Sequence, residues 1–241
     1  MKKAILITAI ALAGLTFQSP AQNLTIGVKG SFISTWLFNK YVSEAPAAEQ
    51  YYVPSFGNSY GLSAAIFFNE SFGIEANFFY STHSQKYAGE GSLTEPEYSS
   101  ETYYNKIEIP LLIKIKSEQG AYFEIGPIYS VISNPTYEYD TDQDILFYIK
   151  HGSPEKDIED AFAKDAIEGM IGLGVDIDLF HHFTLTTALR FSASITDLKG
   201  VDATGINLSD YDPPASTHSA AAGFLLGITY RIGGGSKKSK K

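Results

Sequence analysis

Three aspartates at alternate positions are the first residues of this chain whose spacing suggests chemistry. Asp140, Asp142 and Asp144 are arranged as carboxylates that a loop presents to Ca²⁺. The rest of an EF-hand loop is missing, because Ile145 and His151 stand where its glycine and its closing glutamate would be. We therefore expect a solvated acidic loop, in which loose binding of divalent cations stays open, and no dedicated metal site.

Histidines that lie near serines are the second set with possible chemistry. Nucleophilic catalysis needs the serine and its base within hydrogen-bond reach and a third group that orients the base. The sequence does not establish such a trio, and the pair at His181 and His182 has no convergent metal-binding partner. We therefore expect no catalytic residue, no metal ligand, no cofactor and no enzymatic activity, although these residues were candidates: His83, His151 and His218, with Ser81, Ser84 and Ser216.

Charged residues of both signs form the third set. They recur on one face of otherwise apolar segments, and inside a closed lumen opposite charges can pair and offset their desolvation. We expect a charge network that lines a lumen. An ion-selective pore is the alternative, but the interior of an eight-stranded barrel is normally filled by side chains. The expected network comprises Lys29, Glu75, Glu108, Lys114, Glu124, Asp176, Arg190 and Arg231.

The segments that must position these charges alternate between apolar and polar residues with a period of two. Three tight turns, at about 69–71, 117–120 and 180–182, alternate with four long polar loops, at about 37–57, 84–100, 134–163 and 196–215. This layout predicts an all-β fold, an eight-stranded antiparallel transmembrane β-barrel with short periplasmic turns and long external loops. The expected strands are Leu24–Trp36, Asn58–Asn69, Phe72–His83, Thr102–Lys116, Ala121–Ser133, Asp165–Leu179, Phe183–Ile195 and Ser216–Ile232.

The longest loop also carries a helix signal. Pro154 could occupy the first turn of a short helix that ends at Lys164.

The chemistry of the two faces indicates which one points inward. The polar face carries many small residues, among them Gly61, Gly126 and Gly174, which suit a narrow interior. The opposite face of the fourth segment, from Ile107 to Ile115, has no charge, as contact with lipid requires. A soluble, lipocalin-like barrel with the apolar face inside is the alternative.

Composition narrows the class of protein further. The chain has 241 residues, of which 14% are aromatic and only 19% are charged, which suits one β-domain. It has no cysteine, so disulfides and thiolate metal sites are excluded. The formal net charge of −9 argues against nucleic acid as a partner, because phosphate requires a basic surface.

The ends of the chain predict export. Lys2 and Lys3 precede an apolar run and the small-residue site Ser19-Pro20-Ala21, which together indicate a signal peptide over residues 1–22. The barrel domain is then expected over 23–232, followed by a flexible basic tail over 233–241. The expected location is the bacterial outer membrane, with outer-membrane lipids as partners.

One strand carries a resemblance to a known family. Residues 104–114 read YNKIEIPLLIK, and residues 122–127 of the next strand read YFEIGP. With the edges at Gly27–Gly30 and Gly227–Ile232, these motifs resemble the PorT-like outer-membrane β-barrel family of Bacteroidetes. The namesake of that family is implicated in protein secretion across the outer membrane, and most members have no assigned role.

These observations lead to an expected function and two alternatives. We expect a small barrel with a structural, surface-interaction or secretion-associated role, whose protein partners bind the external loops. A narrow, porin-like transport channel is the alternative. A lipid-modifying outer-membrane enzyme is the third hypothesis.

Overall fold

The computed structural model describes residues 23–39, 51–89, 98–141, 155–157, 162–199 and 216–232. The expected signal peptide, the basic tail, Asp142, Asp144 and His151 lie outside these residues. No helix among the described residues is long and apolar enough to cross a membrane. The strands are β1 (Asn23–Asn39), β2 (Tyr51–Val53), β3 (Ser55–Phe67), β4 (Phe72–Gly89), β5 (Tyr98–Lys116), β6 (Ala121–Thr141), β7 (Glu155–Asp157), β8 (Asp165–Asp178), β9 (Phe183–Ser194) and β10 (Thr217–Ile232).

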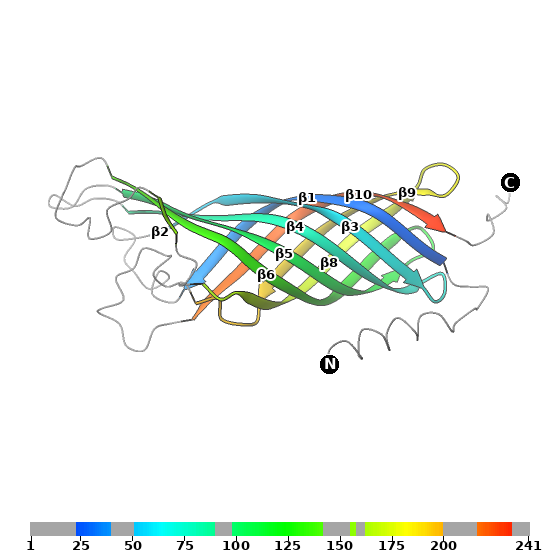
Figure 1. Ribbon diagram of the computed structural model, residues 1–241. Helices are drawn as coiled ribbons and strands as arrows, with labels where there is room; N and C mark the ends of the chain where they lie inside the picture. The colour runs from blue at the N-terminus through cyan, green and yellow to red at the C-terminus, as the bar shows by residue number, and fades with distance from the viewer. Residues whose placement is uncertain are drawn as a thin grey trace, which may run out of the picture.

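Eight of these strands close into a ring. Each long strand pairs antiparallel with its neighbours in the order β1, β3, β4, β5, β6, β8, β9 and β10, and β10 pairs with β1. The first and last strands match over their whole lengths, from Leu24 opposite Ile232 to Asn39 opposite Thr217. Closure leaves no unpaired edge in the wall, and Figure 1 shows the tilted strands around a common axis. The predicted eight-stranded antiparallel barrel is confirmed.

Three tight turns lie at one end of the barrel. Asn69 Oδ1 accepts hydrogen bonds from the main-chain nitrogens of Ser71 and Phe72, and this closes the turn between β3 and β4. Gly120 takes a φ of 93° in the turn between β5 and β6, a conformation that glycine adopts without strain. His181 has a φ of 51° in the third turn. The start of β1 and the end of β10 lie at this same end, which is therefore the periplasmic one (Figure 1).

The two faces of the wall differ as the alternation predicts. Along β3, buried and exposed residues follow each other almost without interruption. In β1, Lys29 is 4% exposed while Val28, its neighbour, is 57% exposed. The exposed side chains are large and apolar on all eight barrel strands, for example Phe32, Leu62, Leu111, Leu173 and Leu189. The outward face is therefore the one that meets lipid.

At the external end the strands continue beyond the expected boundaries. β4, β5 and β6 have 18, 19 and 21 residues, whereas β9 has 12. The loops predicted at 84–100 and 134–163 are therefore shorter in the structure, because their first residues remain in β4 and β6. Figure 1 shows these three strands projecting past the others.

Two short strands widen this projection, which we call the external sheet. β2 pairs with β4 at Tyr51–Val53, and β7 pairs with β6 at Glu155–Asp157. The helix expected from Pro154 to Lys164 is wrong at these residues. The main chain of Glu155–Asp157 is paired with Thr136–Glu138, so it cannot form the hydrogen bonds of a helix.

Candidate functional site: the charged lumen

The lumen is built by the inward residues of all eight barrel strands. The bore is narrow, so several strands approach each other where only glycine fits. At Gly61 and Gly126, a Cβ atom would lie 1.9 Å and 2.0 Å from a carbonyl oxygen of the adjacent strand. At Gly172 and Gly227 a Cβ atom would lie 2.6 Å from the side chains of Glu124 and Lys29, so these two glycines make room for long charged side chains.

Arg190 and the two glutamates around it form the centre of the lumen. Arg190 Nε lies 2.6 Å from Glu124 Oε1, and Arg190 Nη2 lies 3.1 Å from Glu124 Oε2, so the contact is bidentate. Nη2 also lies 3.4 Å from Glu75 Oε1. Lys29, which lies on β1 two strands away from Glu75 in the ring, also donates a hydrogen bond to Glu75. Buried charges are tolerated when they are paired in this way.

Lys114 extends these pairs toward the periplasm. Its Nζ lies 3.7 Å from Glu75 Oε2, 3.4 Å from Asp176 Oδ2 and 3.6 Å from the centre of the Tyr122 ring. Asp176 also binds Lys116 at 3.0 Å. We call Lys29, Glu75, Lys114, Lys116, Glu124, Asp176 and Arg190 the central network.

The structure brings six of the eight expected charges together and places the other two elsewhere. Glu108 lies nearer the external end, where it accepts a hydrogen bond from Ser81 and faces His83 Nε2 at 3.7 Å. Arg231 lies near the periplasmic mouth, 3.5 Å from Asp178, in a largely exposed pair. Neither residue contacts the central network through an ion pair among the described residues.

Another ion pair, which the sequence did not predict, lies outside the central network on its external side. Lys106 Nζ binds Glu168 Oε1 at 2.6 Å and Ser219 Oγ at 3.1 Å, and Ser130 Oγ donates to the same glutamate oxygen at 2.7 Å. Lys106 and Glu168 are almost completely buried. The period of two along a strand could have placed both side chains in the lumen. Lys106 lies on the same face as Glu108, and Glu168 lies on the same face as Gly172.

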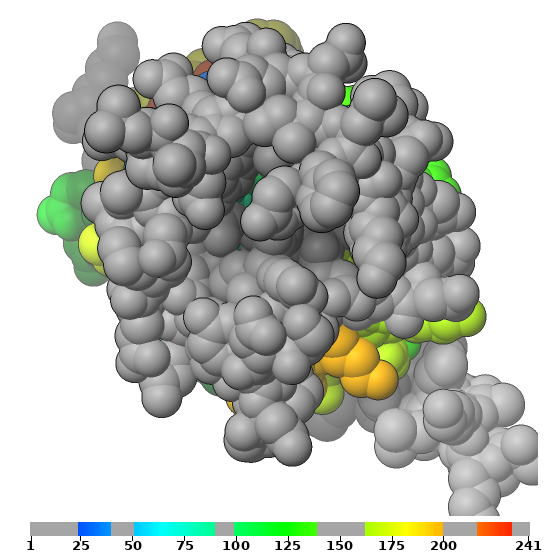
Figure 2. Space-filling model, turned by 90° about the vertical axis from the view of Figure 1, so that its left-hand side faces the viewer, coloured from blue at the N-terminus to red at the C-terminus, as the bar shows by residue number. Residues whose placement is uncertain are grey.

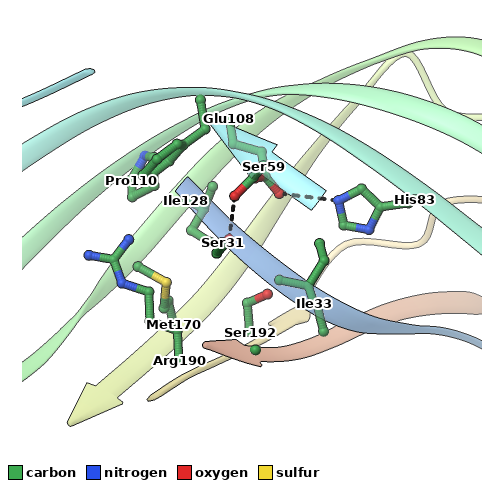
Figure 3. Close-up of a pocket in the computed structure, with 13 residues that line it drawn as sticks. Ser31, Ile33, Ser59, His83, Glu108, Pro110, Ile128, Met170, Arg190 and Ser192 are labelled. Carbon is green, nitrogen blue, oxygen red and sulfur yellow. Dashed lines mark hydrogen bonds and ion pairs between the residues drawn. The ribbon is translucent and has the colours of Figure 1, made fainter. Parts of the chain in front are cut away.

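A small chamber separates the two sets of ion pairs. It has a volume of about 50 Å³, enough for ordered water, and its walls are mixed polar and apolar. Figure 3 shows Glu108 directed toward His83, and Ser31 hydrogen-bonded to Ser59 at 2.5 Å. Ser81 donates to Glu108, and Ser84 donates to the carbonyl of Phe56, so neither serine is activated by His83.

An apolar cluster closes the lumen above Lys106. We call it the outer plug, and it consists of Leu37, Tyr104, Ile132, Phe162, Ala166 and Leu198. Phe162 and Leu198 come from connections between strands, and a bridge between Phe162 and Lys199 joins these connections. In Figure 2, which faces this end, yellow-green and amber residues lie side by side.

The arrangement offers paired charges and close packing around one small chamber, with little capacity to hold a ligand. No three His, Asp or Glu side chains converge to form a metal-binding group in the part of the chain that the structure describes. The lumen is therefore best understood as a filled core that joins opposite walls of the barrel.

Comparison with known proteins agrees with this architecture. The sequence model of the outer membrane protein β-barrel domain family matches residues 18–200. No curated protein matches the sequence of the chain.

Solved structures of small outer-membrane barrels are similar to this chain. Ail, the attachment invasion locus protein of Yersinia pestis, is 10% identical, with 86% of this chain and 98% of that chain covered and a TM-score of 0.39. Neisserial surface protein A is also 10% identical, with 87% and 97% covered and a TM-score of 0.39. The outer membrane protease OmpT of Escherichia coli is 8% identical, with 90% and 98% covered and a TM-score of 0.35. At these identities the likeness concerns the fold alone.

Proposed function

This chain belongs to the family of outer membrane protein β-barrel domains, and on that premise we propose that it is a sealed barrel with a structural or surface-interaction role. Its location is the bacterial outer membrane. In this role the wall anchors the chain in lipid, and the parts beyond the wall meet other molecules.

One observation carries the proposal, namely the closure of the lumen at several levels. The outer plug blocks the external end with six buried apolar side chains. The pair of Lys106 and Glu168 lies beneath it, and the central network crosses the bore beneath the chamber. A solute would have to separate buried ion pairs in order to pass. Breaking such pairs is costly because it leaves charges buried and uncompensated.

The external sheet supports the interaction role. This sheet consists of the parts of β4, β5 and β6 that extend beyond the wall. The short strands β2 and β7 widen it. Cross-strand pairs stiffen it, such as Lys86 with Glu101 at 3.2 Å and the tilted rings of Tyr52 and Tyr87 at 5.6 Å. A rigid surface of this kind reduces the loss of side-chain and loop freedom when a partner binds.

We also propose the finer placement in the PorT-like family of Bacteroidetes, with a secretion-associated role. The support is the strand motif at 104–114 and the Gly126-Pro127 pair that follows it. Secretion of marker proteins in a strain that lacks this chain tests this part. An unchanged set of exported proteins would contradict it.

The sealed lumen is tested by conductance in a planar lipid bilayer. We expect no stable open channel, because the central network and the outer plug both interrupt the bore. The folded protein, checked by the difference in gel mobility before and after boiling, is added to the bilayer in steps. A porin added to the same bilayer controls for insertion.

A steady conductance would support the narrow transport channel instead. In that case neutralising Arg190 or Glu75 should alter ion selectivity, because both side chains lie in the bore. Conductance steps whose size and ion selectivity are the same in both variants as in the unaltered protein would indicate leakage around the barrel.

A further inference from the structure

A serine and a histidine are hydrogen-bonded to each other at the external end of β10. Ser216 Oγ lies 3.1 Å from His218 Nε2. His218 Nδ1 lies 3.2 Å from the carbonyl oxygen of Ser194. Because a carbonyl can only accept, this contact favours the tautomer of His218 that carries the proton on Nδ1, and in that tautomer Nε2 accepts from the Ser216 hydroxyl. Hydrogen bonds thus connect a nucleophile, Ser216, to a base, His218, and the base to a carbonyl that orients it, that of Ser194.

The end of the ladder between β9 and β10 makes this arrangement possible. The last paired residues are Ala193 and Ala220. Beyond them the nitrogen of Ser219 donates to Ser194 Oγ at 2.9 Å, which leaves the Ser194 carbonyl to His218. Ser194 Oγ also lies 3.4 Å from His218 Nδ1. The nitrogen of Thr217 donates to Asp197 at 2.9 Å, which fixes the main chain beside Ser216.

The pair lies on the outside of the barrel, at the external edge of the lipid-facing band. His218 is opposite Phe38, which is 44% exposed and stacks on Trp36 at 6.5 Å. Ile195, which follows Ser194, is 69% exposed. Aromatic side chains at this level are typical of the membrane–water interface. The ester bonds of lipids lie at the same depth, and Ser216 is exposed there.

An apolar hollow in the wall lies deeper in the membrane on the neighbouring strands. Its volume is about 240 Å³, and its lining is almost entirely apolar. Gly169 keeps it open, because a Cβ there would meet only Ile195 Cδ1, at 3.9 Å. The hollow thus adjoins Ile195, next to the Ser194 carbonyl that orients His218. It is lined by Ile125, Gly126, Gly169, Met170, Ile171 and Phe191.

We propose that Ser216 and His218 form an ester-cleaving site for acyl lipids of the outer leaflet, with one acyl chain in this hollow. The site goes beyond the interaction role and does not depend on the lumen. Ser216 Oγ attacks the ester carbonyl carbon while its proton passes to His218 Nε2. The bond between that carbon and the alcohol oxygen of the lipid then breaks, and the leaving oxygen takes the proton.

The deacylated lipid departs, and a water molecule completes the cycle. The water gives a proton to His218 and attacks the acyl-serine ester. The histidine returns that proton to Ser216 Oγ as the fatty acid leaves. The net reaction is an ester and water giving an acid and an alcohol.

Covalent labelling with an alkyl fluorophosphonate tests the proposal on the full, folded chain. We expect the label on Ser216, mapped by mass spectrometry of peptides from the unaltered protein. In phosphatidylethanolamine vesicles we expect release of free fatty acid. Ser216→Ala should remove both signals, and His218→Ala should slow both by about 10²–10⁴-fold, the usual contribution of a general base.

Matched controls lie in the exposed periplasmic turns, where Ser117→Ala and His182→Ala should leave labelling and release unchanged. Gel mobility before and after boiling verifies that each variant is folded. The absence of label on Ser216 in the unaltered protein would overturn the proposal, as would fatty-acid release that persists in Ser216→Ala.

Discussion

Replacing Glu124 with alanine is expected to lower the free energy of unfolding by about 3–5 kcal/mol, the usual cost of removing one partner of a buried ion pair. Glu124 is 0% exposed and binds Arg190 through both carboxylate oxygens. Without it, the one ion pair left to Arg190 among the described residues is the 3.4 Å contact with Glu75. The cost arises from a guanidinium that stays buried after its main partner is lost.

Urea titration in lipid vesicles measures this effect, with the fluorescence of Trp36, the only tryptophan of the chain, as the signal. The control is Asp178→Ala, which breaks the exposed pair with Arg231 and a 3.0 Å hydrogen bond from Thr184 Oγ1 and should cost about 1 kcal/mol. The double variant Glu124→Leu with Arg190→Met should recover much of the lost stability, because both charges are removed. Equal effects of Glu124→Ala and Asp178→Ala would show that the central network is not a buried core.

Gly61→Ala is expected to destabilise the barrel by about 3 kcal/mol or more, the upper part of the range for overpacking. The new Cβ would lie 1.9 Å from the carbonyl oxygen of Phe78, which is main chain and cannot move aside. β3 and β4 would have to separate at this point. Alanine is otherwise favoured over glycine in a strand by roughly 0.5–1 kcal/mol, so the predicted loss has the opposite sign to the intrinsic preference.

The matched control for Gly61→Ala is Gly169→Ala on the outer surface. The nearest atom to a Cβ at Gly169 is Ile195 Cδ1 at 3.9 Å, which is ordinary contact. We expect that variant to fold with unchanged stability under the same urea titration. A Gly61→Ala barrel as stable as the Gly169→Ala barrel would mean that the strands approach less closely than the structure places them.

The alternation of residue types was enough to predict the barrel wall. A one-residue step along a strand reverses the face, so Val28 and Lys29 could be assigned to outside and inside from the sequence. The same parity could have assigned Lys106 and Glu168 to the lumen. It does not give the height of a residue along the axis, which depends on the register of all eight strands. For that reason Glu108 and Arg231 share a face with Glu75 but lie at other levels.

The external sheet and the contact between Ser216 and His218 could not be predicted from the sequence, for a different reason. β2 and β7 have three residues each, too few to display a period, and their strand conformation depends on pairing with β4 and β6. The contact between Ser216 and His218 is local, but its orientation depends on the Ser194 carbonyl from another strand. Sequence reasoning could propose the candidates and could not supply the third group.

The sealed lumen is tested most directly by the reactivity of a single cysteine placed inside it. The chain has no cysteine, so Ser59→Cys introduces a unique thiol on the wall of the chamber. Ser117→Cys, in an exposed periplasmic turn, is the reference. We predict that a charged, membrane-impermeant maleimide labels Cys at 117 rapidly and leaves Cys at 59 unmodified until the barrel is unfolded. Labelling at both positions at similar rates in the folded protein would contradict the sealed barrel and favour an open channel.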